Sequence, residues 1–173
     1  MRTIETRVYR YEELDGFAQR KALAHFSDIN LDHDWYQPTY ETWNEMGVSI
    51  KSFDLYRKHI ELDLMYSFED TAISIVSYFG ENHDGYKFAQ DFLMYKKKLD
   101  KTYENSFDEF GECQEYDDEL EDACDLFYAD LKDSIYTWLE AEFDYLQSEE
   151  AVEQTIIDNE IEFTKEGRVF DYE

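Results

Sequence analysis

The segment from Tyr116 to Leu146 constrains the fold more than any other part of this 173-residue sequence. Its apolar residues recur at steps of three and four, which is the spacing of one face of an α-helix. A helix of that length would extend over roughly 45 Å, and its apolar stripe would anchor it to the rest of the protein. The stripe contains Leu120, Cys124, Phe127, Leu131, Ile135, Trp138 and Leu139.

The other side of this predicted helix is acidic. Between Gly111 and Asp130, nine of twenty residues are Asp or Glu, and none is Lys or Arg. An ordinary exposed helix interleaves Lys with Glu, because like-charge pairs four residues apart cost about 0.2–0.5 kcal/mol each. With residues placed at 100° intervals, one acidic face forms. This acidic face consists of Asp118, Asp122, Asp125, Asp133, Glu140 and Asp144.

The net charge of −27 is concentrated toward the C-terminus. Residues 103–173 contain 25 acidic and three basic side chains, which gives −22. A halophilic surface serves general solvation and would not concentrate charge in this way. The field repels nucleic acid and anionic membranes, and it attracts basic surfaces that normally hold DNA or RNA. We therefore expect a basic nucleic-acid-binding protein as the partner, with no direct binding to nucleic acid or to a membrane.

The chain contains 15 Tyr, 13 Phe and 3 Trp, far more than disordered acidic proteins carry. We expect one folded domain over residues 1–173. No apolar run is long enough to span a membrane, and the N-terminal residues lack the apolar stretch of a signal peptide. On one helix, Cys113 and Cys124 would be roughly 16 Å apart, too far for a disulfide bond. These features predict a reducing, cytoplasmic setting.

The remaining patterns predict an α+β fold, with a small antiparallel sheet covered by helices that include the long acidic one. The sheet would combine an N-terminal strand (3–14), a central strand pair (48–66) that turns near Arg57 and Lys58, and a C-terminal hairpin (160–172) with Gly167 in its turn. Shorter helices are expected at residues 16–26, 38–46, 71–79, 85–99 and 149–158.

Several residues mark the ends of these shorter helices. Asp15, Ser67 and Ser148 are suited to cap helix N-termini. Gly47 and Gly80 are suited to end helices. In the first helix, the predicted core face comprises Phe17, Ala18, Ala22 and Phe26.

Three stretches together resemble a widespread family of phage and prophage accessory proteins, sometimes labelled antitoxin-like. They are "YRYEELDGFAQRKAL", "DWYQPTYETWNEMGVSIKSFDL" and "EFDYLQSEEAVEQTIIDNEIEFTKEGRVF". Members of that family carry a strand pair rich in Gly and Ser after the "FDL" stretch, where this sequence has "YRKHIELDLMYSFEDTAISIV". The resemblance implies a small phage-borne protein that acts inside a bacterial cell.

Catalytic and metal-binding signatures are weak. From Asn30 to Glu41 the spacing of oxygen-bearing side chains is that of a calcium loop, but Trp35 occupies the position where the turn requires glycine. His25, His33, His59 and His83 show no zinc spacing, and there is no nucleophile elbow, phosphate-binding loop or dinucleotide fingerprint. The basic cluster around Lys96 can be neutralised by acidic residues of the protein itself. We expect no enzyme, metal or cofactor.

The acidic face indicates a function through spacing as well as sign. Residues four and seven apart on a helix are separated by about 6 and 10.5 Å, while phosphates on a DNA strand advance by about 3.4 Å per nucleotide. We expect a nucleic-acid mimic that blocks the groove of a host defence nuclease, such as a CRISPR effector or a restriction enzyme. Two alternatives remain: an antitoxin that neutralises a basic toxin, and a non-catalytic structural protein that forms homo-oligomers through its aromatic residues.

Overall fold

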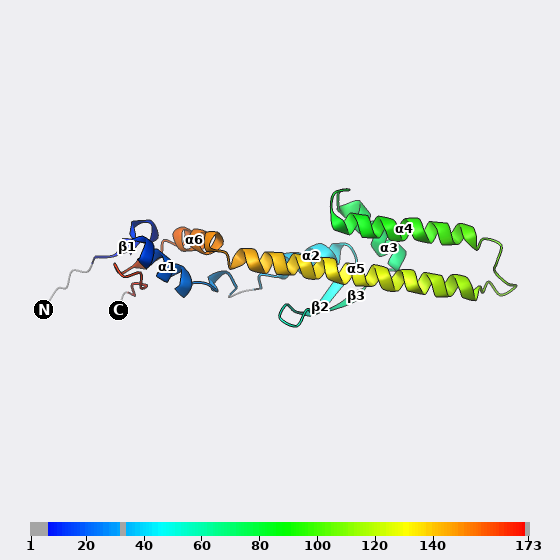
Figure 1. Ribbon diagram of the computed structural model, residues 1–173, viewed down its shortest axis with the longest axis horizontal. Helices are drawn as coiled ribbons and strands as arrows, with labels where there is room; N and C mark the ends of the chain where they lie inside the picture. The colour runs from blue at the N-terminus through cyan, green and yellow to red at the C-terminus, as the bar shows by residue number, and fades with distance from the viewer. Residues whose placement is uncertain (1–6, 32–33, 172–173) are drawn as a thin grey trace. The chain divides into compact units, whose positions relative to one another are not determined.

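The computed structural model describes residues 7–31 and 34–171. The chain divides into two compact units, a central unit of residues 36–140 and a terminal unit of residues 1–35 and 141–173. The long helix α5 (Gln114–Leu146) contributes residues to both units (Figure 1). The α+β class and the long helix are as predicted.

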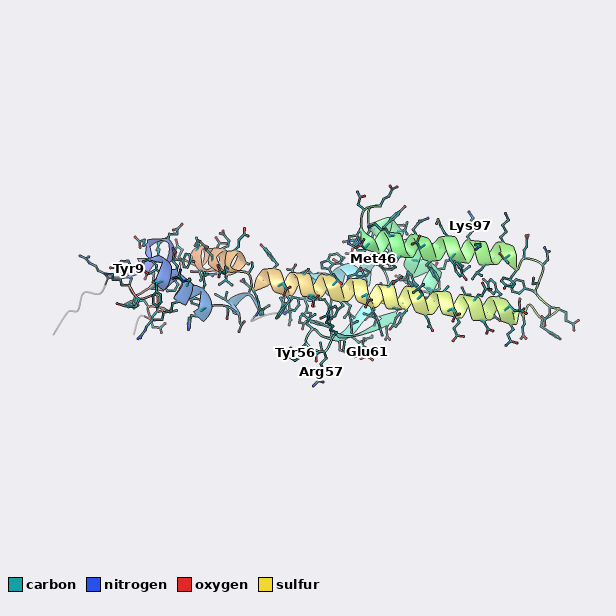
Figure 2. All side chains as sticks on the ribbon, in the orientation of Figure 1. Tyr9, Met46, Tyr56, Arg57, Glu61 and Lys97 are labelled. Carbon is teal, nitrogen blue, oxygen red and sulfur yellow. The ribbon has the colours of Figure 1, made fainter. Side chains whose placement is uncertain are left out.

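The central unit contains a β-hairpin of β2 (Val48–Asp54) and β3 (His59–Leu64), paired antiparallel with a bulge between Ile50 and Ser52. The hairpin turns at the predicted place, where Lys58 has a φ of 51°. At the tip of this turn Tyr56 and Arg57 project away from the sheet (Figure 2). The other elements of the unit besides α5 are α2 (Gln37–Glu45), α3 (Phe68–Tyr78) and α4 (Asp84–Thr102).

Helix boundaries in the central unit follow local chemistry. The Ser67 hydroxyl accepts a 3.1 Å hydrogen bond from the Asp70 N–H, which confirms the predicted start of α3. Gly47 follows α2 with a φ of 83°, and a side chain at this position would collide with the ring of Tyr66. The start of α4 has a cap that the sequence patterns missed, because Nδ1 of His83 accepts from the Gly85 N–H at 3.0 Å.

The core of the central unit is largely aromatic. The Trp43 ring lies 5.9 Å from Trp138 and 5.6 Å from Phe79, in edge-to-face and tilted arrangements. The Phe127 ring of α5 lies 4.8 Å from Phe92 of α4. Two tyrosine hydroxyls of α5 also donate to carbonyl groups of the hairpin, Tyr128 to Leu62 at 2.7 Å and Tyr136 to Leu55 at 2.8 Å. The β2–β3 hairpin and α4 therefore both pack against α5.

The terminal unit has a small core in which α1 and α6 pack with a short sheet. The carboxylate of Asp15 caps α1 by accepting from the N–H groups of Phe17 and Ala18, at 3.0 and 2.9 Å. Gly167 lies in the predicted turn with a φ of 72°, and a Cβ there would collide with the Ala18 backbone. The elements are β1 (Tyr9–Arg10), η1 (Tyr11–Glu13), α1 (Gly16–His25), η2 (Ile29–Leu31), α6 (Glu149–Asp158) and β4 (Glu162–Phe163).

Two local predictions in the terminal unit need correction. The N-terminal strand, expected over residues 3–14, is only Tyr9–Arg10 where the structure describes it, and residues 3–6 lie outside the described part. The chain then turns into η1, because the Glu13 carboxylate accepts from the Arg10 N–H at 2.8 Å. Phe17, expected in the core, is 73% exposed. At 100° per residue it lies away from the side that Ala18 and Ala22 share.

The strands also pair differently from the single sheet expected. β1 pairs with β4 in the terminal unit, and β2 pairs with β3 in the central unit, so the described strands form two separate two-stranded antiparallel sheets. Alternation of apolar and polar residues identifies a strand, but it does not identify the strand's partner.

Candidate partner-binding surface

The apolar stripe of α5 is confirmed as its packing side. Phe127, Leu131, Ile135 and Leu139 are buried, and the other three members of the stripe are half-buried. The remaining surface of α5 is left for solvent or a partner.

All six residues of the acidic face are exposed. Five of them, from Asp118 to Glu140, belong to the central unit, and Asp144 belongs to the terminal unit. Like-charged side chains four residues apart, such as Asp118 and Asp122, therefore stand together on a water-facing surface and repel each other.

The acidic side chains of α5 lack cationic partners. The helix contains twelve Asp and Glu residues and one lysine, Lys132. None of the salt bridges in the described part of the chain involves a carboxylate of α5. The ammonium of Lys132 lies 4.7 Å from the centre of the Tyr128 ring, in a cation–π contact. The charge of α5 is thus left largely unneutralised.

Five basic residues elsewhere in the described chain form salt bridges: Arg10, Lys51, Arg57, Lys87 and Lys96. Nζ of Lys96, in the one basic cluster of the sequence, lies 3.2 Å from a carboxylate oxygen of Glu69 and 3.1 Å from one of Asp100. The expectation that this cluster is neutralised from within the protein is confirmed for Lys96.

The acidic face is not uniform along α5. Near the β2–β3 turn, Asp133 and Glu140 line a hollow of about 430 Å³ together with Lys58 and Lys132. Its neighbouring lysines moderate the local field. Residues 114–130 of α5 contain eight of its twelve acidic side chains and no lysine, whereas residues 131–146 contain the other four and Lys132. The first half of the helix therefore presents the stronger negative potential.

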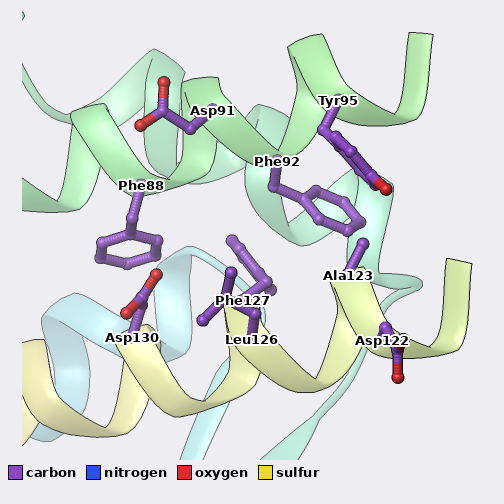
Figure 3. Close-up of a pocket in the computed structure, with 9 residues that line it drawn as sticks. All are labelled: Phe88, Asp91, Phe92, Tyr95, Asp122, Ala123, Leu126, Phe127 and Asp130. Atoms are coloured by element: carbon purple, nitrogen blue, oxygen red, sulfur yellow. The ribbon is translucent and has the colours of Figure 1, made fainter. Parts of the chain in front are cut away.

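A second feature of this region is a groove between α4 and α5, with a volume of about 450 Å³ (Figure 3). Its floor is formed by the rings of Phe88, Phe92 and Phe127. Leu126, on its α5 edge, is 65% exposed. Three carboxylates, one from α4 and two from α5, also line the groove: Asp91, Asp122 and Asp130.

Most of these groove residues were not identified from the sequence. The available signal was Leu126, an apolar residue four positions after Asp122 and thus on the acidic side of the helix. On α4, Phe88, Phe92 and Tyr95 fall at the four- and seven-residue spacing of one helix face.

Tyrosine hydroxyls hold some carboxylates near the start of α5. Glu119 accepts hydrogen bonds from Tyr103 at 2.8 Å and from Tyr95 at 3.2 Å. The bond to Glu119 raises the pKa of Tyr103 above its ordinary value, because ionisation would place two negative charges together. Glu119 therefore joins α5 to α4, and it is less available to a partner than its exposed neighbours.

Three side chains capable of nucleophilic or acid–base chemistry, Cys113, Cys124 and His83, have surroundings that the structure describes. Burial raises the pKa of the Cys124 thiol, which makes it a poorer nucleophile. Cys113 is buried, and both thiols are free. His83 caps α4 and stacks on Phe79 with ring centroids 3.8 Å apart.

The proposed calcium loop uses its first side chain for packing within the terminal unit. The amide of Asn30 donates to the Leu146 carbonyl at 2.9 Å and accepts from the Thr155 hydroxyl at 2.7 Å. Asp32 and His33 lie outside the described residues. Within residues 7–31 and 34–171, no three or more metal-binding side chains come together.

Over the same residues, no helix combines the length and the apolar character that a membrane span requires. No protein-family model, curated protein or solved structure matches the chain.

Proposed function

We propose that this protein is an acidic inhibitor that occupies the nucleic-acid-binding groove of a basic protein. The observation that carries the proposal is the state of α5, which has twelve acidic residues, one lysine and no carboxylate in a salt bridge within the described chain. Repulsion on such a surface costs free energy that a basic partner would recover.

Inhibition by this surface requires no chemical step. A basic groove that binds DNA or RNA releases counterions when its lysines and arginines meet phosphates. The carboxylates of the acidic face would release the same counterions, and the body of the protein would block the groove. Asp118, Asp122 and Asp125 are separated along the helix axis by about 4.5 to 6 Å per step, which is between one and two of the roughly 3.4 Å steps from one phosphate to the next along a DNA strand.

The target class follows from the charge and from the sequence resemblance to phage accessory proteins. A host defence nuclease, such as a CRISPR effector or a restriction enzyme, combines a basic groove with a reason for a phage to block it. The protein would then act in the cytoplasm of a bacterial host.

The test uses the full chain as bait in a bacterial lysate, followed by measurement of affinity for the captured protein. Binding should weaken steeply between 50 and 300 mM salt and should compete with a DNA or RNA oligonucleotide. A small co-encoded toxin as the captured protein would identify an antitoxin instead. A partner that holds oligonucleotide and inhibitor at the same time would contradict occupation of the groove.

A matched pair of variants separates the acidic face from the total charge. Replacing all six of its carboxylates by amides should weaken binding at least a hundredfold. Replacing six exposed glutamates elsewhere changes the charge equally and should have a much smaller effect. The control positions are Glu12, Glu45, Glu81, Glu104, Glu109 and Glu166.

A non-catalytic oligomer is the second candidate, because several large apolar side chains are exposed. Sedimentation of the unliganded protein over a range of concentrations tests it directly. The most exposed of these residues are Phe17, Tyr56, Phe110, Leu126 and Tyr145.

A further inference from the structure

The groove between α4 and α5 has a feature that phosphate mimicry does not use, which is an apolar floor. The ring of Phe127 packs against both Phe92 and Phe88, at 4.8 and 5.5 Å, and the three rings close the bottom of the groove. The exposed Leu126 and Tyr95 form opposite edges (Figure 3). Phe127 and Phe92 are only 2% and 6% exposed, so the apolar area open to a partner comes mainly from Phe88, Leu126 and Tyr95. A surface that interacts through charge alone would have no reason to expose this area.

The rim of the groove is acidic. Asp91 extends from α4, and Asp122 and Asp130 extend from α5. None of these three carboxylates takes part in a salt bridge within the described chain. Asp130 is half-buried, and its pKa is raised by burial and by the nearby charges of Asp133 and Asp91. A cation bound at the rim would favour the ionised carboxylate and so act against both effects.

We propose that this groove binds a basic amphipathic helix of the partner protein, with an apolar or aromatic side chain on the floor and Arg or Lys against the rim. An amphipathic helix in a groove between two helices is a common mode of peptide recognition. The volume of about 450 Å³ accommodates one or two large side chains. This proposal depends on the proposed inhibitory function in one respect only, which is the identity of the protein that supplies the helix.

Charge argues against the other possible occupants. Phosphates of a nucleic acid would be repelled by the three rim carboxylates. A second copy of this chain would bring another net charge of −27 to the same rim. The lysine labelled on α4 in Figure 2, Lys97, projects on the side away from the groove and does not line it.

The test uses two synthetic helical peptides with equal numbers of arginines and the full-length protein. The amphipathic peptide carries Leu and Trp along one face, and the charge-only peptide carries Ala and Ser there. We expect the amphipathic peptide to bind at least tenfold more tightly, with NMR shifts centred on Phe88, Phe92, Leu126 and Phe127. Equal affinities, or shifts centred elsewhere, would overturn the proposal.

Variants that preserve the charge separate the groove from the electrostatic field. Leu126→Ser should remove the tenfold difference between the two peptides. Ile73→Ser, at an exposed position of α3 outside the groove, should leave it unchanged. If Leu126→Ser has no effect while both peptides still bind in a salt-dependent manner, the groove proposal fails and the mimicry proposal remains.

The rim has its own matched control. The rim variant carries Asp91→Asn, Asp122→Asn and Asp130→Asn, and the control variant carries Asp117→Asn, Asp118→Asn and Asp125→Asn. Both variants change the net charge by three. The rim variant should lower the affinity for the amphipathic peptide at least tenfold more than the control variant does. Equal losses would assign binding to the general field and overturn the groove site. Sedimentation of the unliganded protein tests whether a second copy of the chain occupies the groove. A dimer that Leu126→Ser dissociates would assign the groove to a second copy and overturn the proposal.

Discussion

The hydroxyl of Tyr116 donates a 2.7 Å hydrogen bond to Oδ1 of Asp100, and this bond joins the start of α5 to the end of α4. It lowers the pKa of Asp100, with a smaller contribution from Lys96, and it raises the pKa of Tyr116. The two shifts have the same origin, because the bond favours an ionised carboxylate together with a neutral phenol.

A pH dependence follows from the signs of these two shifts. The lowered pKa of Asp100 contributes stability above its unfolded value of about 3.9, and the raised pKa of Tyr116 contributes below about 10. Tyr116→Phe should therefore cost most stability between these limits and progressively less below and above them. Urea unfolding at pH 3, 7 and 11 measures the difference. Carbon NMR should show the pKa of Asp100 rising in the variant, whereas Tyr56→Phe, at a fully exposed residue, should leave it unchanged.

Charge reversal on α5 should remove binding without unfolding the protein. The five-fold variant carries Asp118→Lys, Asp122→Lys, Asp133→Lys, Glu140→Lys and Asp144→Lys. These side chains are exposed and make no salt bridge in the described chain, so the free energy of unfolding should change little or rise. Circular dichroism measures folding, and a partner-binding or nuclease assay measures function. A folded five-fold variant that still binds its partner normally would mean that this face is only solvated surface. The search would then turn to the loop at residues 28–34 and the aromatic segment at 35–43.

Substitutions on the packing side of the same helix should have the opposite result. Leu131→Asp and Trp138→Asp place a carboxylate without a cation inside the core of the central unit, so each should lower the free energy of unfolding by about 4 kcal/mol or more. Thermal melting followed by circular dichroism measures the loss. Leu126→Asp is the control on α5, because that side chain is mostly exposed, and it should stay folded.

Added salt should stabilise the unliganded protein. A chain with a net charge of −27 repels itself, and 0.1 M salt limits such repulsion to about 10 Å. The melting temperature should rise between 20 and 300 mM sodium chloride, while affinity for a basic partner falls over the same range. A melting temperature that decreases with salt would mean that attractive pairs dominate the folded state.

Thr71→Val should stabilise the central unit. The Thr71 side chain is fully buried, and its hydroxyl has no hydrogen-bond partner among the described residues. Valine has nearly the same shape without the buried polar group, so the free energy of unfolding should rise by about 1 kcal/mol. Thr137→Val, at an exposed position, should change it by less than about 0.5 kcal/mol. Urea titration distinguishes the two.

The long helix was predictable because its apolar stripe, from Leu120 to Leu139, repeats over about five turns, and a single misassigned residue cannot alter such a pattern. Helix starts at Asp15 and Ser67 were predictable for a different reason, since a cap is a contact between near neighbours in the sequence. The prediction for Phe17 failed because a single aromatic residue in the first turn of a helix carries little information about whether it faces the core or the solvent.

Features that depend on distant parts of the chain were not predictable. The pairing of β1 with β4 joins residues about 150 positions apart, and neither segment contains a signal that identifies the other as its partner strand. The groove arises only where α4 and α5 come together, so neither sequence contains it alone. The acidic face was predictable as a surface of one helix, but Lys58, which reaches the hollow of Asp133 and Glu140 from the β2–β3 turn, was not.

Gly167 sets a limit on how this protein can evolve. A side chain there would collide with the backbone at Ala18, which cannot move aside as a flexible side chain can. Asp and Glu, by contrast, can exchange freely on the exposed surface of α5 as long as the sign of the charge is kept. Lineages descended from this protein should therefore retain the glycine while their acidic surfaces diverge in sequence, until the turn shows their common ancestry more clearly than α5 does.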